Sequence, residues 1–180
     1  MNIFAVNQNP IQAAKELSNK HVIKMISESL TMLSFAFPEG TAAIKNSRSN
    51  PHHRHPASIW ARQSRENFDW LLTHALALCD EYTLRYKREH IYQEPLLDYC
   101  SKADTLYFPT VSLTPFACCF GDFKGKIDMQ NPVAAYQEFY RLDKADFARW
   151  PSIEKIPAWW HIKTEDFVDK SFKNGQYIKR

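Results

Sequence analysis

The sequence predicts a mainly α-helical protein: a single compact helical domain with long loops and an aromatic C-terminal tail. Apolar residues recur at three- and four-residue spacing over residues 20–37 and 56–90, which is the helical period. Proline and glycine gather in the segments between these stretches. The 180 residues are 44% hydrophobic and 14% aromatic, which is enough apolar material for one core.

The first third of the chain predicts an arm, two helices and a loop. An apolar run over residues 3–6 is typical of a short strand or an extended arm. A short helix is expected over residues 11–17, with a proline in its first turn. Asn19 can cap the next helix, which runs over residues 20–37. Residues 38–56 then form a polar loop.

The remaining two thirds predict three helices, a second loop and the tail. Residues 56–90 fit one long helix, and residues 95–103 fit a brief one. Residues 104–131 contain prolines and glycines and are expected to be mostly loop. An Asn-Pro pair opens a helix over residues 132–150. The tail, residues 151–180, carries tryptophans, a short polar helix and a basic end.

Composition excludes several classes of function. The chain has only four glycines, so glycine-rich loops that bind mononucleotide or dinucleotide phosphates are excluded, and no cofactor is expected. It has no apolar run of membrane-spanning length and no secretory leader, so we expect a soluble, cytoplasmic protein that does not contact membranes. The cysteines have no CxxC spacing, and we expect reduced thiols at Cys79, Cys100, Cys118 and Cys119.

The strongest functional signal lies in the second predicted helix. His21 and Glu28 are seven residues apart, which places them about 20° apart on one helical stripe, and Lys24 falls between them. A carboxylate beside a lysine and a histidine is suited to proton transfer, or to stabilising a cation at a sugar anomeric carbon. The alternative is an ordinary surface ion pair. Apolar residues occupy the opposite face: Val22, Ile23, Ile26 and Leu30.

A second signal is a local excess of positive charge. The net charge is only +3, but no acidic residue falls between Glu39 and Glu66, where many basic residues and histidines do. Such a segment can follow a phosphate backbone, or it can be a solvated loop. The adjacent histidines at residues 52–55 have no acidic neighbour, so we expect no metal site.

The start of the third predicted helix adds anion-binding features. Helix N-termini offer free N–H groups, and arginine adds a bidentate grip on phosphate. Trp60 fits either the core or a stacking position against a base. Arg85 lies in a basic cluster near the helix end, where charge also suits the helix dipole. The candidate phosphate-binding or nucleic-acid-binding residues are Lys20, Arg48, His55, Trp60, Arg62, Arg65, Asn67 and Arg85.

Several pieces of the chain resemble the phage pyrimidine-dimer DNA glycosylases of the endonuclease V type, which are small all-α enzymes. The pieces are Leu17-Ser18-Asn19-Lys20-His21 with Glu28, the stretch from Pro56 through Arg85, and Pro157-Ala158-Trp159. They cover about half of the chain. The chain also resembles phage-encoded proteins of unassigned function, which share the Lys-His-Val-x-Lys-Met and His-Pro-x-Ser-Ile-Trp-Ala-Arg strings.

The first resemblance implies a mechanism. In that family the α-amine of the chain attacks the anomeric carbon while a glutamate assists, so Glu28 would be that glutamate and His21 its neighbour. The chain departs from the family at two places. Asn2, rather than a small residue, follows Met1, which disfavours methionine removal and leaves the nucleophile undetermined. Ser27 and Thr31 stand where the family has arginines.

The sequence therefore predicts a helical enzyme that acts on a DNA base or nucleotide, most simply by cleaving an N-glycosidic bond. Glu28, His21 and Lys24 are the expected catalytic residues, and DNA or a nucleotide is the expected partner. One alternative is an accessory protein that binds nucleic acid, a nucleotide signal or a host protein without catalysis. Another is a nucleotide-modifying transferase. The sequence leaves the oligomeric state open.

Overall fold

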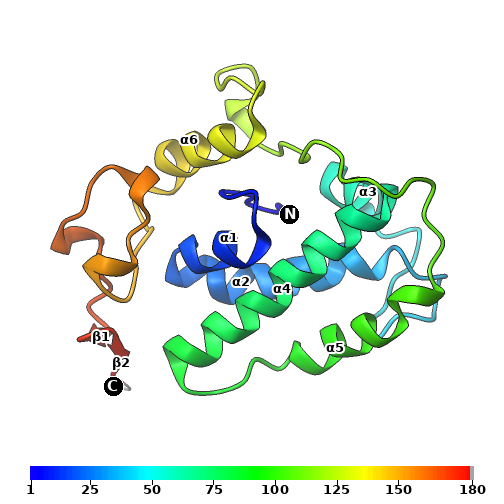
Figure 1. Cartoon of the computed structure of the whole chain (residues 1–180), viewed down its shortest axis with the longest axis horizontal. Helices are drawn as coiled ribbons and strands as arrows, with labels where there is room; N and C mark the ends of the chain where they lie inside the picture. The colour runs from blue at the N-terminus through cyan, green and yellow to red at the C-terminus, as the bar shows by residue number, and fades with distance from the viewer. Residues whose placement is uncertain (179–180) are drawn as a thin grey trace.

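The mainly α-helical prediction is confirmed by a computed structural model, which describes residues 1–178 (Figure 1). Short 3-10 turns and a small hairpin complete the fold. The α-helices are α1 (Pro10–Glu16), α2 (Asn19–Ser34), α3 (Pro56–Gln63), α4 (Arg65–Tyr86), α5 (Gln93–Lys102) and α6 (Pro132–Lys144). The 3-10 turns are η1 (Pro51–Arg54), η2 (Ala103–Thr105), η3 (Gly121–Phe123), η4 (Ile153–Lys155), η5 (Ala158–Trp160) and η6 (Glu165–Phe167). The antiparallel strands are β1 (Phe172–Lys173) and β2 (Gln176–Tyr177).

Helix α4 is the central element of the fold. It packs against α1, α2, α3 and α5, and crosses the molecule diagonally in Figure 1. Phe68, Leu71, Ala75 and Leu78 are fully buried, and their three- and four-residue spacing keeps them on one side of the helix. This long apolar stripe is the reason that the other helices collect around α4.

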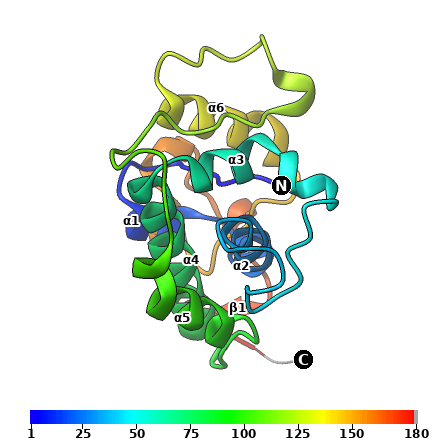
Figure 2. The same ribbon diagram turned by 90° about the vertical axis from the view of Figure 1, so that its right-hand side faces the viewer.

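The N-terminal arm is buried and forms no strand. It passes between α2 and α6, as the two views in Figure 1 and Figure 2 show. The Phe4 ring stacks on the His21 ring of α2 at a centroid distance of 4.4 Å. On the other side, the Gln137 side chain of α6 donates to the Val6 carbonyl at 2.8 Å. The arm therefore acts as a layer of the core, held by side-chain and turn hydrogen bonds rather than by a sheet.

The predicted helix over residues 56–90 is two helices. Ser64 separates α3 from α4 with extended backbone angles, φ −143° and ψ 159°. Its hydroxyl accepts the Asn67 N–H at 3.1 Å and so caps α4. The following N–H, that of Arg65, donates to the Thr110 carbonyl at 3.0 Å. The break occurs because this junction is paired with the 104–131 loop.

Two further boundaries differ from the prediction. Ser18, not Asn19, is the N-cap of α2, because Asn19 is already helical and its N–H donates to the Arg149 carbonyl at 2.8 Å. Helix α6 ends at Lys144 and does not reach Trp150, which is fully buried against the tail.

The C-terminal tail also differs from its prediction. It contains η4, η5 and η6 and the β1–β2 hairpin in place of a polar α-helix. Its backbone pairs with the segment after α6, since the Trp150 N–H donates to the Phe167 carbonyl at 2.9 Å. The last two residues of the predicted tail lie outside the described residues.

Candidate active site at the amino terminus

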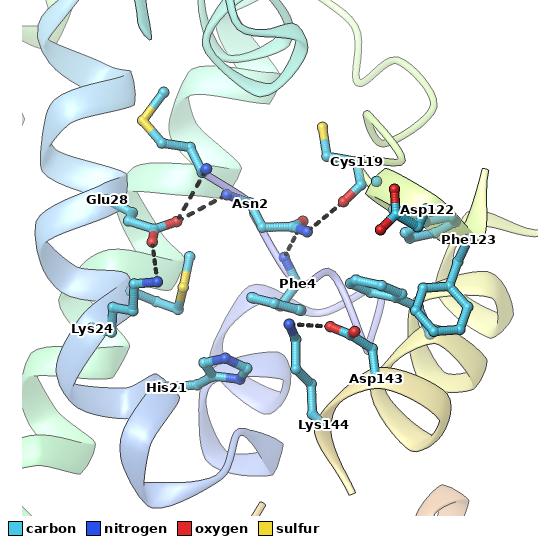
Figure 3. A pocket seen from close by; sticks show the side chains of 15 residues that line it. Asn2, Phe4, His21, Lys24, Glu28, Cys119, Asp122, Phe123, Asp143 and Lys144 are labelled. Carbon is cyan, nitrogen blue, oxygen red and sulfur yellow. Dashed lines mark hydrogen bonds and ion pairs between the residues drawn. The ribbon is translucent and has the colours of Figure 1, made fainter. Parts of the chain in front are cut away.

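A cavity of about 340 Å³ lies where the N-terminal arm meets α2, η3 and α6 (Figure 3). One wall is the predicted stripe of α2, with His21, Lys24 and Glu28. The first residues of the arm form a second wall. Residues 119–123 and the α6 residues Phe139, Asp143 and Lys144 close it opposite. Four segments that are distant in sequence therefore share one pocket.

The helical period places the polar stripe in this pocket. Val22, Ile26 and Leu30 point into the core, being at most 1% exposed. Ile23 does not share that face, since 41% of it is exposed to solvent. The stripe residues differ in exposure, because the Glu28 side chain is 15% exposed and the Lys24 side chain 69%. Glu28 therefore sits inside the pocket, and Lys24 stands at its mouth.

The Glu28 carboxylate is the meeting point of three nitrogens. Its Oε2 accepts the backbone N–H of Asn2 at 3.0 Å and lies 3.9 Å from the terminal nitrogen of Met1. Its Oε1 lies 3.2 Å from Lys24 Nζ. Figure 3 shows all three contacts on one carboxylate. Two amines and one carboxylate thus share a partly dry site, where charge interactions are stronger than in water.

Asn2 anchors the start of the chain in the pocket. Its side chain is buried, and its amide nitrogen donates to the Cys119 carbonyl at 2.8 Å. Its amide oxygen accepts the Ile3 N–H at 2.9 Å. Phe4 follows with a positive φ of 43°, a conformation that is uncommon for a residue other than glycine. These contacts fix the direction of the arm, and hence the position of the terminal amine.

His21 is a neutral, buried wall of the pocket. Its Nδ1 lies 2.6 Å from the Tyr140 hydroxyl, which also accepts the Ser18 N–H at 3.0 Å. Burial, together with the positive charges of Lys144 and Lys24, lowers the pKa of His21 to about 3. The imidazole is therefore uncharged at neutral pH. It can shape the pocket and offer a hydrogen bond, but it holds no proton to donate as an imidazolium.

His55 lies near this site as well. Its Nδ1 accepts the Ala57 N–H at 3.2 Å and so caps α3. Burial lowers the pKa of His55, and the terminal amine adds to that effect while Glu28 opposes it.

Two of the predicted arginines lie around a different pocket. Arg48 and Arg62 line a cavity of about 450 Å³ together with His53, Phe35 and Tyr107. Arg62 donates to the carbonyls of His53 and Ser58 at 2.8 and 3.1 Å, and burial lowers its pKa. Arg48 is more open, since only its backbone N–H is engaged, by Glu39.

Two other residues that were predicted to bind phosphate or nucleic acid instead bond to neighbouring groups of the protein. Arg65 pairs with Asp69 and Asp104, at 2.8 and 2.9 Å. Asn67 is fully buried and donates to the Trp60 carbonyl at 2.8 Å and to Thr114 Oγ1 at 2.7 Å.

Trp60 and Arg85 are likewise internal. Trp60 is 3% exposed and packs on Phe116, with ring centroids 5.6 Å apart. Arg85 is 2% exposed and is ion-paired to Glu81. Lys20, by contrast, is exposed, with its Nζ 5.2 Å from the centroid of the Phe147 ring.

Sequence reasoning did not identify the wall opposite α2. The 104–131 segment was expected to be loop, yet Cys119, Phe120 and Phe123 come from it. A signal was present in the two phenylalanines that flank Gly121 and Asp122, because apolar rings in a polar loop need a surface to pack against.

Three general features of the described residues bear on function. Within residues 1–178 there is no group of three or more His, Cys, Asp or Glu side chains that could hold a metal ion. No helix in this part of the chain is long and apolar enough to cross a membrane. All four cysteines are free thiols.

Comparison with known protein families gives a match over the first half of the chain. The sequence profile of the family described as pyrimidine dimer DNA glycosylase matches residues 1–94. The matched stretch includes the arm, α2 and α4, and so contains Met1, His21, Lys24 and Glu28. No curated protein and no solved structure matches the chain.

Proposed function

Since the chain belongs to the pyrimidine dimer DNA glycosylase family, we propose that it cleaves the N-glycosidic bond of a pyrimidine in damaged or modified DNA. Membership in this family implies DNA binding. The observation that carries the proposal is the distance of 3.9 Å between the terminal nitrogen of Met1 and Glu28 Oε2, inside a pocket that His21 and Lys24 also line.

The proposed nucleophile is the α-amine of the chain. Its nitrogen gives its lone pair to C1′ of the sugar, and the C1′–N bond to the base breaks with its electron pair leaving on the base. The amine loses one proton, and the base takes up one. Opening of the C1′–O4′ bond then gives an imine between the amine nitrogen and C1′, with the nitrogen proton passing to O4′. Water hydrolyses this imine and returns the free amine.

Glu28 is the proposed assisting carboxylate. A negative charge held beside C1′ stabilises the positive charge that develops on the sugar as the base leaves. Its contact with Asn2 N–H and its proximity to the Met1 nitrogen orient it toward the attacking amine.

His21 and Lys24 have supporting roles in this proposal. His21 is neutral and buried between Phe4 and Tyr140, so it fixes the shape of the pocket floor. Lys24 stands at the mouth, where its exposed ammonium can bind a phosphate next to the reacting nucleotide.

Proposed DNA contacts extend outward from the mouth. Lys20 is exposed one turn before Lys24 on α2, and Arg48 is the more open of the two arginines around the second pocket. Access to C1′ within a duplex requires extrusion of a nucleotide, and these exposed cations would hold the distorted backbone.

The test is chemical trapping of the imine. The full-length protein is mixed with duplex DNA containing a cyclobutane pyrimidine dimer or an abasic site, and borohydride is added. Borohydride reduces an imine to a stable amine, so a covalent protein–DNA adduct is expected on both substrates. Folded protein that gives neither adduct nor released base on any lesion would refute the glycosylase.

Peptide mapping of the adduct identifies the nucleophile. We expect the crosslink on the first residue, which intact mass shows to be Met1 or, if the methionine has been removed, Asn2, whose nitrogen is 3.0 Å from Glu28. Lys24 is the other amine next to Glu28, so Lys24→Gln is the matched control. That variant is expected to keep the crosslink. A crosslink that maps to Lys24 and is lost in this variant would reassign the nucleophile.

A further inference from the structure

The far side of the pocket comes from a part of the chain that the family match does not reach. The match ends at residue 94, whereas Phe120, Phe123 and Phe139 lie beyond it. All three line the pocket whose other wall carries Glu28 and the terminal amine, and Figure 3 shows Phe123 on the side away from Glu28. The pocket is thus divided into a polar side and an aromatic side.

The three rings support one another. Phe120 and Phe139 are buried, 3% and 5% exposed, with centroids 4.9 Å apart. Phe123 stands edge-on to Phe139, with centroids 5.7 Å apart, and is only half-buried. Phe139, itself packed on Phe120, therefore braces Phe123, which is still partly exposed.

The charges around the rings favour Phe123 as the contact surface. Lys144 Nζ lies 5.2 Å from the Phe139 centroid and 5.7 Å from that of Phe4, and it is ion-paired with Asp143. Its ammonium, which also lines the pocket, therefore already contacts those two rings. Lys126 Nζ lies 5.5 Å from the Phe123 centroid and is itself exposed. Because Lys126 is long, flexible and solvated, an aromatic group can take its place on that ring.

We propose that Phe123 is the stacking surface for the base whose glycosidic bond is cleaved, with Phe120 and Phe139 as its support. This proposal rests on the proposed function, since the amine and Glu28 would face the sugar while Phe123 holds the base. Stacking of a base on an aromatic side chain contributes about tenfold to hundredfold in affinity. The aromatic side of the pocket would then select substrates that still carry a base.

The test compares DNA with and without the base. Phe123→Ala is expected to slow base release in a pyrimidine-dimer duplex by about tenfold or more. Base release here means cleavage of the bond between the base and its sugar, measured as the abasic sugar that forms, because the base stays joined to its neighbour in the dimer. The same variant should form the borohydride adduct with abasic DNA at the wild-type rate, within about twofold, because that reaction needs no base. Phe123→Trp, which restores an aromatic face, should recover base release. Base release by Phe123→Ala at the wild-type rate, or equal loss on both substrates, would overturn the proposal.

A binding measurement makes the test independent of turnover. In a Glu28→Gln background, Phe123→Ala should weaken binding to the dimer duplex by about tenfold and to the abasic duplex by less than about twofold. Equal effects on the two duplexes would overturn the stacking role even if no variant showed turnover. If the wild-type protein formed no borohydride adduct with abasic DNA, that result would count against the proposed function and not against the stacking role.

Tyr177→Ala is the matched control for loss of an aromatic ring. Tyr177 is 41% exposed in β2, which lies at the opposite end of the molecule from α6 (Figure 1). We expect this variant to leave base release, adduct formation and both affinities unchanged. Thermal unfolding of each variant confirms that the pocket is compared in folded proteins.

Discussion

The backbone N–H of Asn2 donates to Glu28 Oε2 over 3.0 Å, joining the start of the chain to a helix residue 26 positions away. Because Asn2 is also tied to the Cys119 carbonyl, this hydrogen bond belongs to a frame that spans 117 positions of sequence. The frame puts the terminal amine and the carboxylate in one pocket, a prerequisite for the chemistry that we propose.

Glu28→Gln separates catalysis from binding. The amide keeps an oxygen that accepts the Asn2 N–H, but it removes the negative charge that would stabilise the developing cation at C1′. We expect base release to fall by about a hundredfold or more, with affinity for DNA unchanged within about twofold. Single-turnover kinetics and fluorescence anisotropy measure the two quantities. A protein that only binds DNA would show neither a base-release activity nor an effect of this variant.

Arg85→Met is expected to destabilise the fold. The guanidinium is 2% exposed, pairs with Glu81, and donates to the Leu17 carbonyl and to Asn19 Oδ1 at 2.9 and 3.0 Å. Removing one member of a buried pair leaves the other charge uncompensated, at a cost of about 3–5 kcal/mol. Urea unfolding measures the change.

Arg65→Met is the control for that variant. Arg65 also has two carboxylate partners, but its side chain is 34% exposed, so water screens the pairs. We expect a loss below about 1 kcal/mol. Equal losses for the two variants would mean that Arg85 does not brace α1, α2 and α4.

Acid is expected to destabilise the protein through two buried histidines. Burial lowers the pKa of His21 to about 3 and that of His74 to about 4, both below the value of 6.5 expected in the unfolded chain. At a pH between the folded-state pKa of each histidine and 6.5, the unfolded chain binds more protons than the folded protein. The free energy of unfolding therefore falls as the pH falls from about 6.5. Each group contributes up to about 1.4 kcal/mol per pH unit.

Urea unfolding between about pH 7 and pH 5 measures this slope. Most carboxylates stay ionised in that window, so the histidines dominate it. His74→Gln should lower this slope by the amount that corresponds to the uptake of about one proton on unfolding. It should leave the pocket unchanged, since His74 Nδ1 lies in the core, where it bonds the Pro10 carbonyl. A stability that is independent of pH in this window would contradict the buried neutral histidines.

Salt dependence distinguishes exposed cations from paired ones. Lys20 is exposed at the start of α2, one turn before Lys24, whereas Arg65 is held by two carboxylates. Lys20→Gln should weaken DNA binding and lower the slope of log K against log salt by about 0.9, the value for one phosphate contact. Arg65→Gln should leave the slope unchanged. The reverse result would indicate that DNA binds at the start of α4, where Arg65 lies.

Local pattern was sufficient for some of the site and not for the rest. The stripe of His21, Lys24 and Glu28 could be predicted because it depends only on the helical period, which is a property of neighbouring residues. Arg85 was expected to contact phosphate because a cation at a helix end looks solvated in sequence. Its partners, the carbonyls of residues 15 and 17, come from a segment that the sequence does not place.

The sequence by itself determined the helical class, the polar stripe on α2 and the family, because these follow from local periodicity and from matched residues within 1–94. Only the tertiary structure decided what faces that stripe. The terminal amine, the Cys119 carbonyl and the Phe123 ring reach the pocket through packing of segments about a hundred residues apart. Such contacts arise from the burial of the whole core, and no local sequence pattern encodes them.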